Sequence, residues 1–301
     1  MQLRTNTTPR HRRLRSAVGV EPTSIEVPDL ESTVTSAAPS ADVPAVIEAW
    51  TEPTVVLPRV SVIVPALNEA ENLPHVLPHI PDVHEVILVD GWSTDGTMEV
   101  ARQLRPDIRI VSQQRRGKGA ALCAGFEAAT GDIIVTIDAD GSTDPREIPL
   151  FVDALKNGAD FVKGSRFLDG GGTSDMPVYR QLGNFGFVVM VRALYGGRFT
   201  DLCYGYNAFW KRVLPALDLD GDGFEIETMM NIRALRAGLR VAEVPSFESA
   251  RVYGEGRLRT IPDGMRVLRT ILSERLPRRF RRRRIAPMTP ADVVPERARV
   301  D

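Results

Sequence analysis

The sequence has little cysteine and little histidine, which limits the kinds of site it can build. Its 301 residues include two cysteines and four histidines. Cys123 and Cys203 form no Cys-x-x-Cys pattern, which argues against a disulfide framework and against a structural zinc site. His75 and His79 have helical spacing but lack the glutamate of a helical zinc motif. We expect these histidines to be solvated or packed.

Long apolar runs and an excess of one charge are also missing from the sequence. No segment approaches the ~20 apolar residues needed to span a bilayer, and no apolar core follows the basic N-terminus, so we expect no secretory signal. The formal net charge is −1, which gives no reason to expect nucleic acid as a partner. We therefore expect a cytoplasmic protein that is soluble or peripheral on the inner face of the plasma membrane.

Composition predicts three parts of the chain. Residues 1–57 are rich in Ser, Thr, Pro, Ala and Val without a sustained period, which predicts a disordered N-terminal extension with a short helix near residues 46–50. One folded domain is expected over residues 58–276. Residues 277–301 contain RRFRRRR and predict a largely disordered basic tail, which would suit an anionic lipid surface at roughly 1 kcal/mol per cation. A tail without a partner, or one that binds nucleic acid, is the alternative.

Short β-rich runs alternate with helical patterns in the first half of this domain. Strands are expected at residues 60–64, 85–89, 108–111, 132–137 and 160–163. Helices are expected at residues 69–77, from 93 or 94 to 105, 117–129 and 145–156. This alternation with short connections predicts an α/β fold, in which helices flank both faces of a Rossmann-like, mainly parallel sheet.

Polar motifs follow the ends of several of these strands. Ligands of parallel sheets bind beyond the carboxyl ends of the strands, so Pro65–Glu69, Asp90, the loop at Gly117 and the segment at 138–140 should share one edge. Asp138 and Asp140 stand two residues apart where a strand ends, so both should point the same way. Mg²⁺ and Mn²⁺ prefer oxygen ligands, often carboxylates together with substrate phosphates. The pair predicts a metal–diphosphate site, and a solvated turn is the alternative.

The glycine patterns of two common nucleotide-binding classes are absent. The dinucleotide fingerprint should follow the first strand, where the chain reads PALNEAEN. Gly117-Lys118-Gly119 follows the third strand and lacks a third glycine. A P-loop would need glycine at position 112 and serine or threonine at position 119, but the chain has Ser112 and Gly119. Oxidoreductase and P-loop NTPase functions are therefore disfavoured.

Motifs in a fixed order along the chain point to a known family. The first four are Val62–Asn72 (VIVPALNEAEN), Val89–Thr97 (VDGWSTDGT), Arg116–Ala120 (RGKGA) and Asp138–Asp140. Together they resemble the family 2 glycosyltransferases, which have a GT-A fold. Five later motifs resemble the dolichol- or polyprenyl-phosphate hexose (mannose or glucose) synthase branch: Lys163–Phe167, Arg180–Asn184, Asp201–Asn207, Gly223–Glu227 and Pro245–Leu258. The resemblance covers about residues 58 to 276.

The resemblance implies a single catalytic domain that transfers a hexose with inversion. The donor would be a nucleotide-diphosphate sugar of the GDP-mannose or UDP-glucose type, the acceptor a polyprenyl phosphate at a membrane surface, and the cofactor Mg²⁺ or Mn²⁺ held by Asp140 and Asp138. By position, the nucleotide-sugar pocket would include Pro65, Leu67, Glu69, Asp90, Lys118, Asp138 and Ala139. The implied catalytic residues are Asp138, Asp140, Arg166, Arg251 and Arg257, with Arg180, Glu225 and Glu227 on the acceptor side.

Some positions depart from the family pattern. Gly91 and Trp92 follow Asp90, where relatives usually carry a second acid, so the donor base stays open. Gly141-Ser142 follows the second acid, where relatives often place an amide, so a third metal ligand also stays open.

Two other functions remain as alternatives. A hydroxyl acceptor would need a base, and Glu225 or Glu227, which would share a face of a strand, could serve. A non-catalytic sugar-nucleotide-binding scaffold is the second alternative. The apolar stretch Phe185–Leu194 predicts a core helix on the sheet, or else an interfacial helix that guides a polyprenyl chain to the site.

Overall fold

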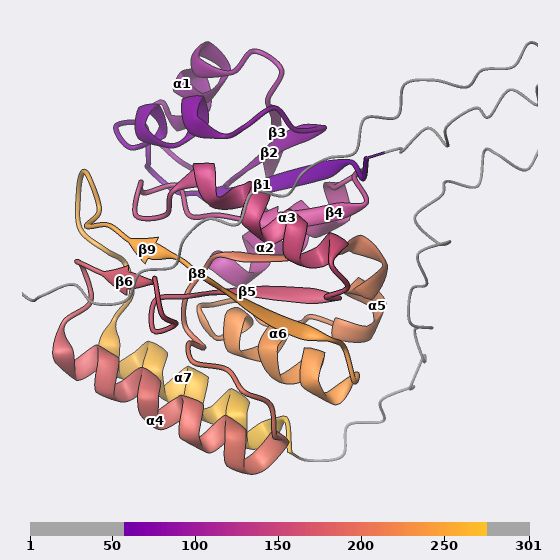
Figure 1. The fold of residues 1–301 in the computed structure, drawn as a ribbon. Coiled ribbons are helices and arrows are strands. Elements are labelled where there is room, and N and C mark those ends of the chain that lie inside the picture. Colours follow the sequence, from indigo (N-terminus) through magenta and orange to yellow (C-terminus); the bar gives the residue numbers. More distant parts are fainter. Residues whose placement is uncertain (1–56, 276–301) are drawn as a thin grey trace, which may run out of the picture. The chain divides into compact units, whose positions relative to one another are not determined.

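The computed structural model describes residues 57–275 (Figure 1). Apart from Leu57, the expected N-terminal extension, its short helix and the basic tail lie outside the described residues, and the domain boundaries stay predictions. A seven-stranded sheet runs in the order β3-β2-β1-β4-β7-β5-β8. Its strands are β1 Val60–Ala66, β2 Glu85–Asp90, β3 Arg109–Ser112, β4 Ile133–Thr136, β5 Phe161–Ser165, β7 Asn207–Trp210 and β8 Val241–Pro245.

The sheet is mainly parallel, as the sequence predicts. β1 pairs in parallel with β2 and β4, β2 with β3, and β5 with β8. β7 is the exception, because it runs antiparallel between β4 and β5. The strand–helix alternation of residues 58–163 contains no sign of this strand, which comes from a later part of the chain. A small parallel pair, β6 Gly172–Thr173 and β9 Phe247–Glu248, forms a separate sheet.

Helices cover the sheet and bury its apolar runs. They are α1 Thr97–Leu104, α2 Lys118–Ala128, α3 Ile148–Lys156, α5 Leu214–Leu217 and α6 Glu225–Arg236. α2 packs on β1 and β2, and α3 packs on β5, β7 and β8. Strand residues such as Val62, Ile87 and Ile134 have no exposed surface, because parallel strands are covered on both faces.

The helix predicted at residues 69–77 is wrong in type. Two short 3₁₀ helices stand there, Leu73–His75 and Leu77–His79. Each has a proline in its first turn, and a proline ring removes a backbone donor and obstructs a continuous α-helix. Leu73 and Leu77 are buried nonetheless, so the apolar spacing correctly indicates a buried face.

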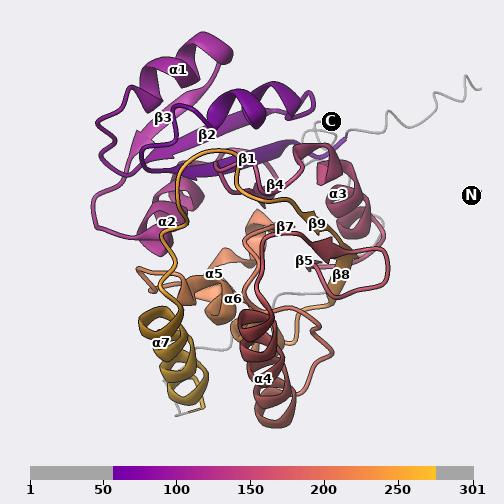
Figure 2. The same cartoon turned by 90° about the vertical axis from the view of Figure 1, so that its left-hand side faces the viewer.

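Two long helices form a layer of their own. They are α4 Val178–Tyr195 and α7 Thr260–Ser273, and both views show them side by side (Figures 1 and 2). Val188 and Val191 of α4 meet Val267 and Ile271 of α7 in a second apolar cluster, to which α6 contributes Ile232. The expected helix at 185–194 therefore exists within α4, but it packs chiefly on α6 and α7 rather than on the sheet. None of the described helices is long and apolar enough to cross a membrane.

Gly125 lets α2 lie close to the sheet. A Cβ at this position would lie 2.5 Å from Cγ2 of Ile63 and 3.1 Å from Cγ2 of Val89. Both neighbours are buried and β-branched, so neither can turn aside easily. We expect Gly125→Ala to lower the free energy of unfolding by about 1–3 kcal/mol, because overpacking outweighs the better helix propensity of alanine. Urea denaturation measures this change.

A glycine in the interior of α4 offers the matched control. A Cβ at Gly186 would have no atom within 4 Å, so Gly186→Ala meets no clash. We expect this variant to be neutral or stabilised by up to about 1 kcal/mol. Similar stabilities for the two variants would contradict the packing argument.

Candidate active site

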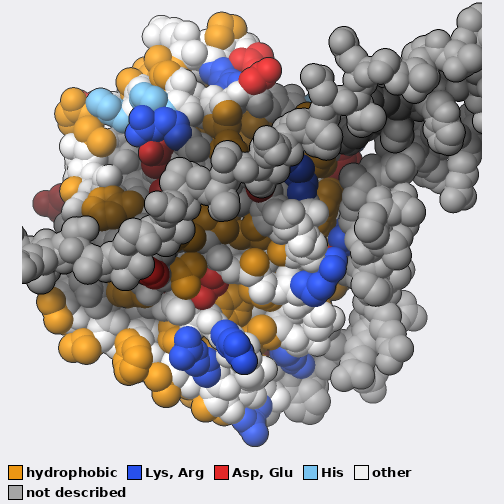
Figure 3. Space-filling model, viewed as in Figure 1, with side chains coloured by type: hydrophobic (Ala, Val, Ile, Leu, Met, Phe, Trp, Pro, Cys, Tyr) orange, Lys and Arg blue, Asp and Glu red, His pale blue; other side chains and the backbone are white. Residues whose placement is uncertain are grey.

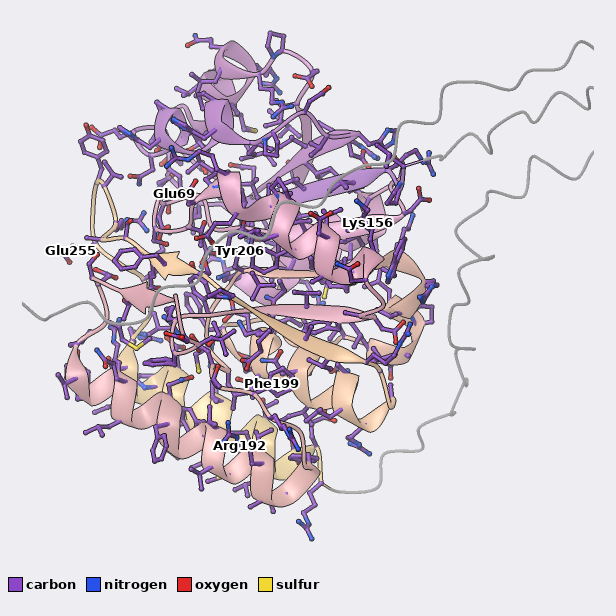
Figure 4. All side chains as sticks on the ribbon, viewed as in Figure 1. Glu69, Lys156, Arg192, Phe199, Tyr206 and Glu255 are labelled. Carbon is purple, nitrogen blue, oxygen red and sulfur yellow. The ribbon has the colours of Figure 1, made fainter. Side chains whose placement is uncertain are left out.

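A cavity of about 460 Å³ lies at the carboxyl ends of the central strands. Pro65 and Leu67 line it from the end of β1, and Asp138 and Asp140 line it from the loop after β4. Twelve sequence-predicted site residues line it: Pro65, Leu67, Glu69, Lys118, Asp138, Ala139, Asp140, Arg166, Arg180, Glu227, Arg251 and Arg257. Figure 4 shows Glu69 and Glu255 on one side of the molecule, where the loop between β9 and α7 runs, and Lys156 on the opposite side.

Two predicted site residues do not line this cavity. Asp90 is 2% exposed, and its carboxylate accepts hydrogen bonds from the backbone N–H groups of Trp92 (3.0 Å) and Ser93 (3.1 Å). Glu225 accepts a hydrogen bond from the backbone N–H of Gly223 (3.0 Å) and so closes the turn before α6. Both carboxylates thus serve their own turns.

The strand expected around Glu225 and Glu227 is wrong. Both residues lie in the first turn of α6, where positions two apart do not face each other. Glu227 lines the cavity, whereas Glu225 does not. Acidic residues in a first helical turn suit the helix dipole, and this signal favours a helix over the alternating strand.

Lys118 stands between two carboxylates. Its Nζ lies 2.6 Å from Oδ1 of Asp138 and 2.7 Å from Oε1 of Glu227. Burial opposes the charge of Lys118, but the two carboxylates outweigh it and raise the pKa of this lysine. Burial likewise raises the pKa of Glu227, against the effect of Lys118. This lysine comes from the start of α2, so α2 and α6 together hold the carboxylate of Asp138.

Arg251 balances the second acid of the pair. Its Nη1 lies 3.3 Å from Oδ2 of Asp140, and its Nη2 contacts Oε2 of Glu69. Burial opposes the charge of Arg251, but Glu69 and Asp140 raise its pKa. Oδ1 of Asp140 accepts hydrogen bonds from the backbone N–H (3.0 Å) and the hydroxyl (2.7 Å) of Ser142. Residues far apart in the sequence therefore meet at the end of β4.

The loop between β9 and α7 carries Arg251 across the cavity. Tyr253, in the same loop, donates its backbone N–H to Oδ1 of Asn72 (2.9 Å), and Nδ2 of Asn72 donates to the carbonyl of Tyr253 (3.2 Å). These bonds tie the loop to the segment after β1.

Arg166 is held by two carboxylates inside the protein. Its Nε and Nη2 donate to the two oxygens of Asp201 (2.7 and 3.0 Å), and its Nη1 donates to Glu248 (3.0 Å). Burial opposes this charge, but the two acids raise the pKa of Arg166, and Arg166 in turn lowers the pKa of Asp201 against its burial. These ion pairs indicate a structural role, in which Arg166 links the end of β5 to β9. Contact between Arg166 and a phosphate stays a prediction.

Arg180 and Arg257 carry charge without a carboxylate partner among residues 57–275. Nε of Arg180 donates to Oγ1 of Thr260 (3.1 Å), and its Nη2 donates to the carbonyl of Leu258 (3.2 Å), so this arginine joins α4 to the start of α7. Arg257 is exposed and has no ion pair with a described residue. Both line the cavity, so both charges are available to an anion.

Three further residues belong to this site that the sequence patterns did not single out. Asp201 and Glu248 stand in quoted motifs, but only the fold shows that both bind Arg166. Gln113 lines the cavity directly after β3. The rule that ligands bind at the carboxyl ends of parallel strands could have identified it.

The acids at the end of β4 are suited to a divalent cation that also binds phosphate. Among the described residues, no group of three or more His, Cys, Asp or Glu side chains is arranged to hold a metal ion. Asp138 and Asp140 still offer carboxylate oxygens into one cavity. Mg²⁺ is commonly bound by one or two carboxylates, substrate phosphates and water, so the donor set fits this kind of site.

Removing Arg166 should destabilise the protein strongly. Its side chain and that of Asp201 are 4% and 0% exposed, so Arg166→Met leaves a buried charge without its partner. We expect the free energy of unfolding, measured in urea at neutral pH, to fall by about 3–5 kcal/mol. Arg146→Met is the matched control, because its pair with Asp144 is exposed and should change stability little. An equally small loss of stability in both variants would contradict the structural role of Arg166.

Comparisons with known proteins identify the family. Residues 61–217 match the family model for glycosyl transferase family 2. A dolichol-phosphate mannosyltransferase of Pyrococcus furiosus is 34% identical over 67% of this chain and 59% of the relative, so the chain spans less than two thirds of that protein. An undecaprenyl-phosphate mannosyltransferase of Micrococcus luteus is 34% identical over 66% of this chain and 87% of the relative.

Solved structures agree with this assignment. Glucosyl-3-phosphoglycerate synthase from Mycobacterium tuberculosis, in complex with Mg²⁺ and uridine diphosphate, has a TM-score of 0.57 and 27% identity, over 72% of this chain and 79% of that one. This likeness confirms the GT-A-like α/β fold that the motifs implied. The family model, the relatives and the fold agree: the chain belongs to glycosyl transferase family 2 and is a glycosyltransferase.

Proposed function

We propose that the protein transfers a hexose, with inversion, from a nucleotide-diphosphate sugar to a polyprenyl phosphate. The observation that carries this proposal is that two kinds of charged group line the cavity. Asp138 and Asp140 line it from the loop after β4, whereas Arg180 on α4 and Arg257 before α7 line it without a carboxylate partner in the described region. The curated relatives whose names specify dolichol-phosphate and undecaprenyl-phosphate as substrates support this acceptor.

The donor diphosphate would bind at the end of β4. Asp138 and Asp140 would hold Mg²⁺ or Mn²⁺ together with phosphate oxygens, and the cation would neutralise charge that develops on the leaving diphosphate. Lys118 keeps the carboxylate of Asp138 in place, and Arg251 lies close enough to Asp140 to add a second positive charge beside the diphosphate. The similar solved structures of glucosyl-3-phosphoglycerate synthase, which contain Mg²⁺ or Mn²⁺ with uridine diphosphate, support a metal of this kind.

A phosphate acceptor needs cations rather than a base. One of its oxygens is already anionic and attacks C1 of the sugar, while the bond from C1 to the donor diphosphate breaks and its electrons leave with the nucleoside diphosphate. Attack opposite to the leaving group inverts the configuration at C1. Arg180 and Arg257 would position the acceptor phosphate, since arginine matches phosphate geometry.

A soluble hydroxyl acceptor is the second candidate. The specific observation in its favour is the likeness to glucosyl-3-phosphoglycerate synthase, which was solved with phosphoglyceric acid. Such an acceptor needs a base within hydrogen-bond reach. Glu227 is paired with Lys118, and Glu225 serves the turn before α6 outside the cavity lining. These contacts favour the phosphate acceptor. A scaffold without activity is disfavoured by the family and by the acidic pair.

An apolar surface beside the cavity supports delivery of the acceptor from a membrane. The exposed apolar side chains of α4 are Val178, Tyr179, Leu182, Phe185 and Val189, and those of α7 are Ile261, Met265 and Leu272. Their spacing places each set along one helical face. Figure 3 shows hydrophobic side chains gathered along the lower left edge, over α4.

This surface favours the interfacial role of the α4 helix over a core role. Leu182 and Phe185 are 66% and 64% exposed, which is uncommon for apolar side chains of this size in a contiguous patch. A membrane interface would cover them. The polyprenyl chain would then enter the cavity from the side of α4 and α7. Peripheral binding at the cytoplasmic face stays a prediction.

Loss of the second acid should abolish transfer. Asp140→Asn removes one negative charge from the expected metal site without changing its size. With radiolabelled GDP-mannose or UDP-glucose, Mg²⁺ and membranes, we expect the rate of label entry into the organic phase to fall roughly 10²–10³-fold. Asp153→Asn, in an exposed pair on α3, should retain the rate. Label that appears only in a water-soluble glycoside would overturn the lipid acceptor.

The apolar face of α4 should be required for membrane binding. The double substitution Leu182→Ser and Phe185→Ser replaces two exposed apolar side chains, so stability should change little while affinity for anionic vesicles falls about tenfold or more. Vesicle sedimentation measures this affinity. Leu150→Ser on α3, where Leu150 is 53% exposed, is the control. Equal vesicle binding by all three proteins would refute the proposed membrane face.

A further inference from the structure

Gln113 is a largely buried residue whose side-chain amide has no hydrogen-bond partner among the described residues. It follows β3 directly, its backbone N–H donates to the carbonyl of Asp90 (3.1 Å), and 6% of the residue is exposed. Its side chain makes no hydrogen bond to any residue between 57 and 275. It lines the cavity with Pro65 and Leu67 from the end of β1. The amide is not among the fully buried, unpaired polar groups of the described residues, so its polar atoms open to the cavity and can meet a ligand there.

Asp90, the acid next to this position, is turned away from the cavity. Trp92 adopts a left-handed backbone conformation (φ 65°), which is rare for a bulky residue. Its N–H and that of Ser93 both bond to the carboxylate of Asp90. The carboxylate of Asp90 therefore bonds within its own turn and does not line the cavity, whereas Gln113 does.

Gly91 lets the side chain of Gln113 lie close to the end of β1. A Cβ at position 91 would lie 3.2 Å from Cβ of Leu67 and 3.4 Å from Nε2 of Gln113. A side chain at this position would therefore crowd both residues. With glycine here, Gln113 lines the cavity together with Pro65 and Leu67, and an amide beside apolar side chains suits a flat, polar ring.

The order of strands places Gln113 at a suitable distance from the diphosphate site. β3 is separated from β4 by β2 and β1, and three strand spacings amount to roughly 14 Å. An extended nucleoside diphosphate bound at Asp138 and Asp140 can reach across this width with its base. Arg180 of α4 and Arg257 before α7, which we assign to the acceptor phosphate, also line the cavity, so the residues at the end of β3 are left for the base.

We propose that Gln113 recognises the base of the donor nucleotide by hydrogen bonds. This inference rests on the proposed nucleotide-sugar function. An amide offers one acceptor and one donor side by side. It therefore matches a base edge that carries an N–H next to a carbonyl, as guanine and uracil both do. Oε1 of Gln113 accepts from the ring N–H, and Nε2 donates to the carbonyl oxygen of the base.

The first test replaces the amide with an apolar group of similar length. Gln113→Met should weaken binding of both GDP and UDP, measured calorimetrically with Mg²⁺, roughly tenfold or more. Inorganic pyrophosphate, which has no base, should bind this variant as it binds the unaltered protein. Gln114→Met is the matched control, because Gln114 is the exposed neighbour and receives the same substitution.

The second test introduces a carboxylate, which should interact differently with guanine and with uracil. Gln113→Glu presents two acceptors, which suit the adjacent N–H groups of guanine and repel one of the carbonyls that flank the N–H of uracil. We expect the ratio of the dissociation constants, UDP over GDP, to rise roughly tenfold. A residue with only a structural role would leave this ratio unchanged.

Three results would overturn the proposal. Unchanged nucleotide binding by Gln113→Met excludes base recognition, and an equal loss of pyrophosphate binding assigns Gln113 a structural role. If the methionine variant does not fold, an unchanged ratio in Gln113→Glu excludes base recognition on its own. Failure of the unaltered protein to bind either nucleotide would instead remove the proposed function itself, and this inference with it.

Discussion

Two carboxylates in one short loop repel each other unless cations balance them, and the candidate site is built around that balance. Lys118 from α2 pairs with Asp138, and Arg251 from the loop after β9 pairs with Asp140. Each cation also binds a further acid, Glu227 or Glu69, so the charges form two linked chains rather than isolated pairs. These chains connect segments that are far apart in sequence. The charge requirement of the acids thereby also organises the tertiary structure around the cavity.

The arginines of the cavity divide into two kinds according to their partners. Arg166 is buried against Asp201 and Glu248, where its charge is neutralised and its guanidinium holds β5 and β9 together. Arg180 and Arg257 meet no carboxylate among the described residues, so their charge remains for an anionic ligand. A sequence motif alone makes these arginines look equivalent. Only the contacts separate a structural cation from one that can bind phosphate.

The fold was largely predictable because the sheet is parallel and buried. Runs such as VSVIV and EVILV indicate their strands plainly, and glycine and polar residues mark the turns at their carboxyl ends. Three local features were harder to predict. β7 enters from a later segment, proline changes the helix after β1 into 3₁₀ turns, and the acids of α6 resemble an alternating strand. In each case neighbouring residues or long-range pairing override a short pattern.

The sequence by itself determined the family, the parallel strands with the motifs that follow them, and the acidic pair. All of these depend on local composition and spacing. The tertiary structure alone decided which charges are neutralised and which are open. In the folded protein the carboxylates of Asp90 and Glu225 accept hydrogen bonds from backbone N–H groups of their own turns. Gln113, by contrast, lines the cavity. It also placed α4 against α7 rather than on the sheet, so that one apolar face stays exposed. Side-chain partners across long sequence separations depend on the packing of whole elements, and no local pattern contains that information.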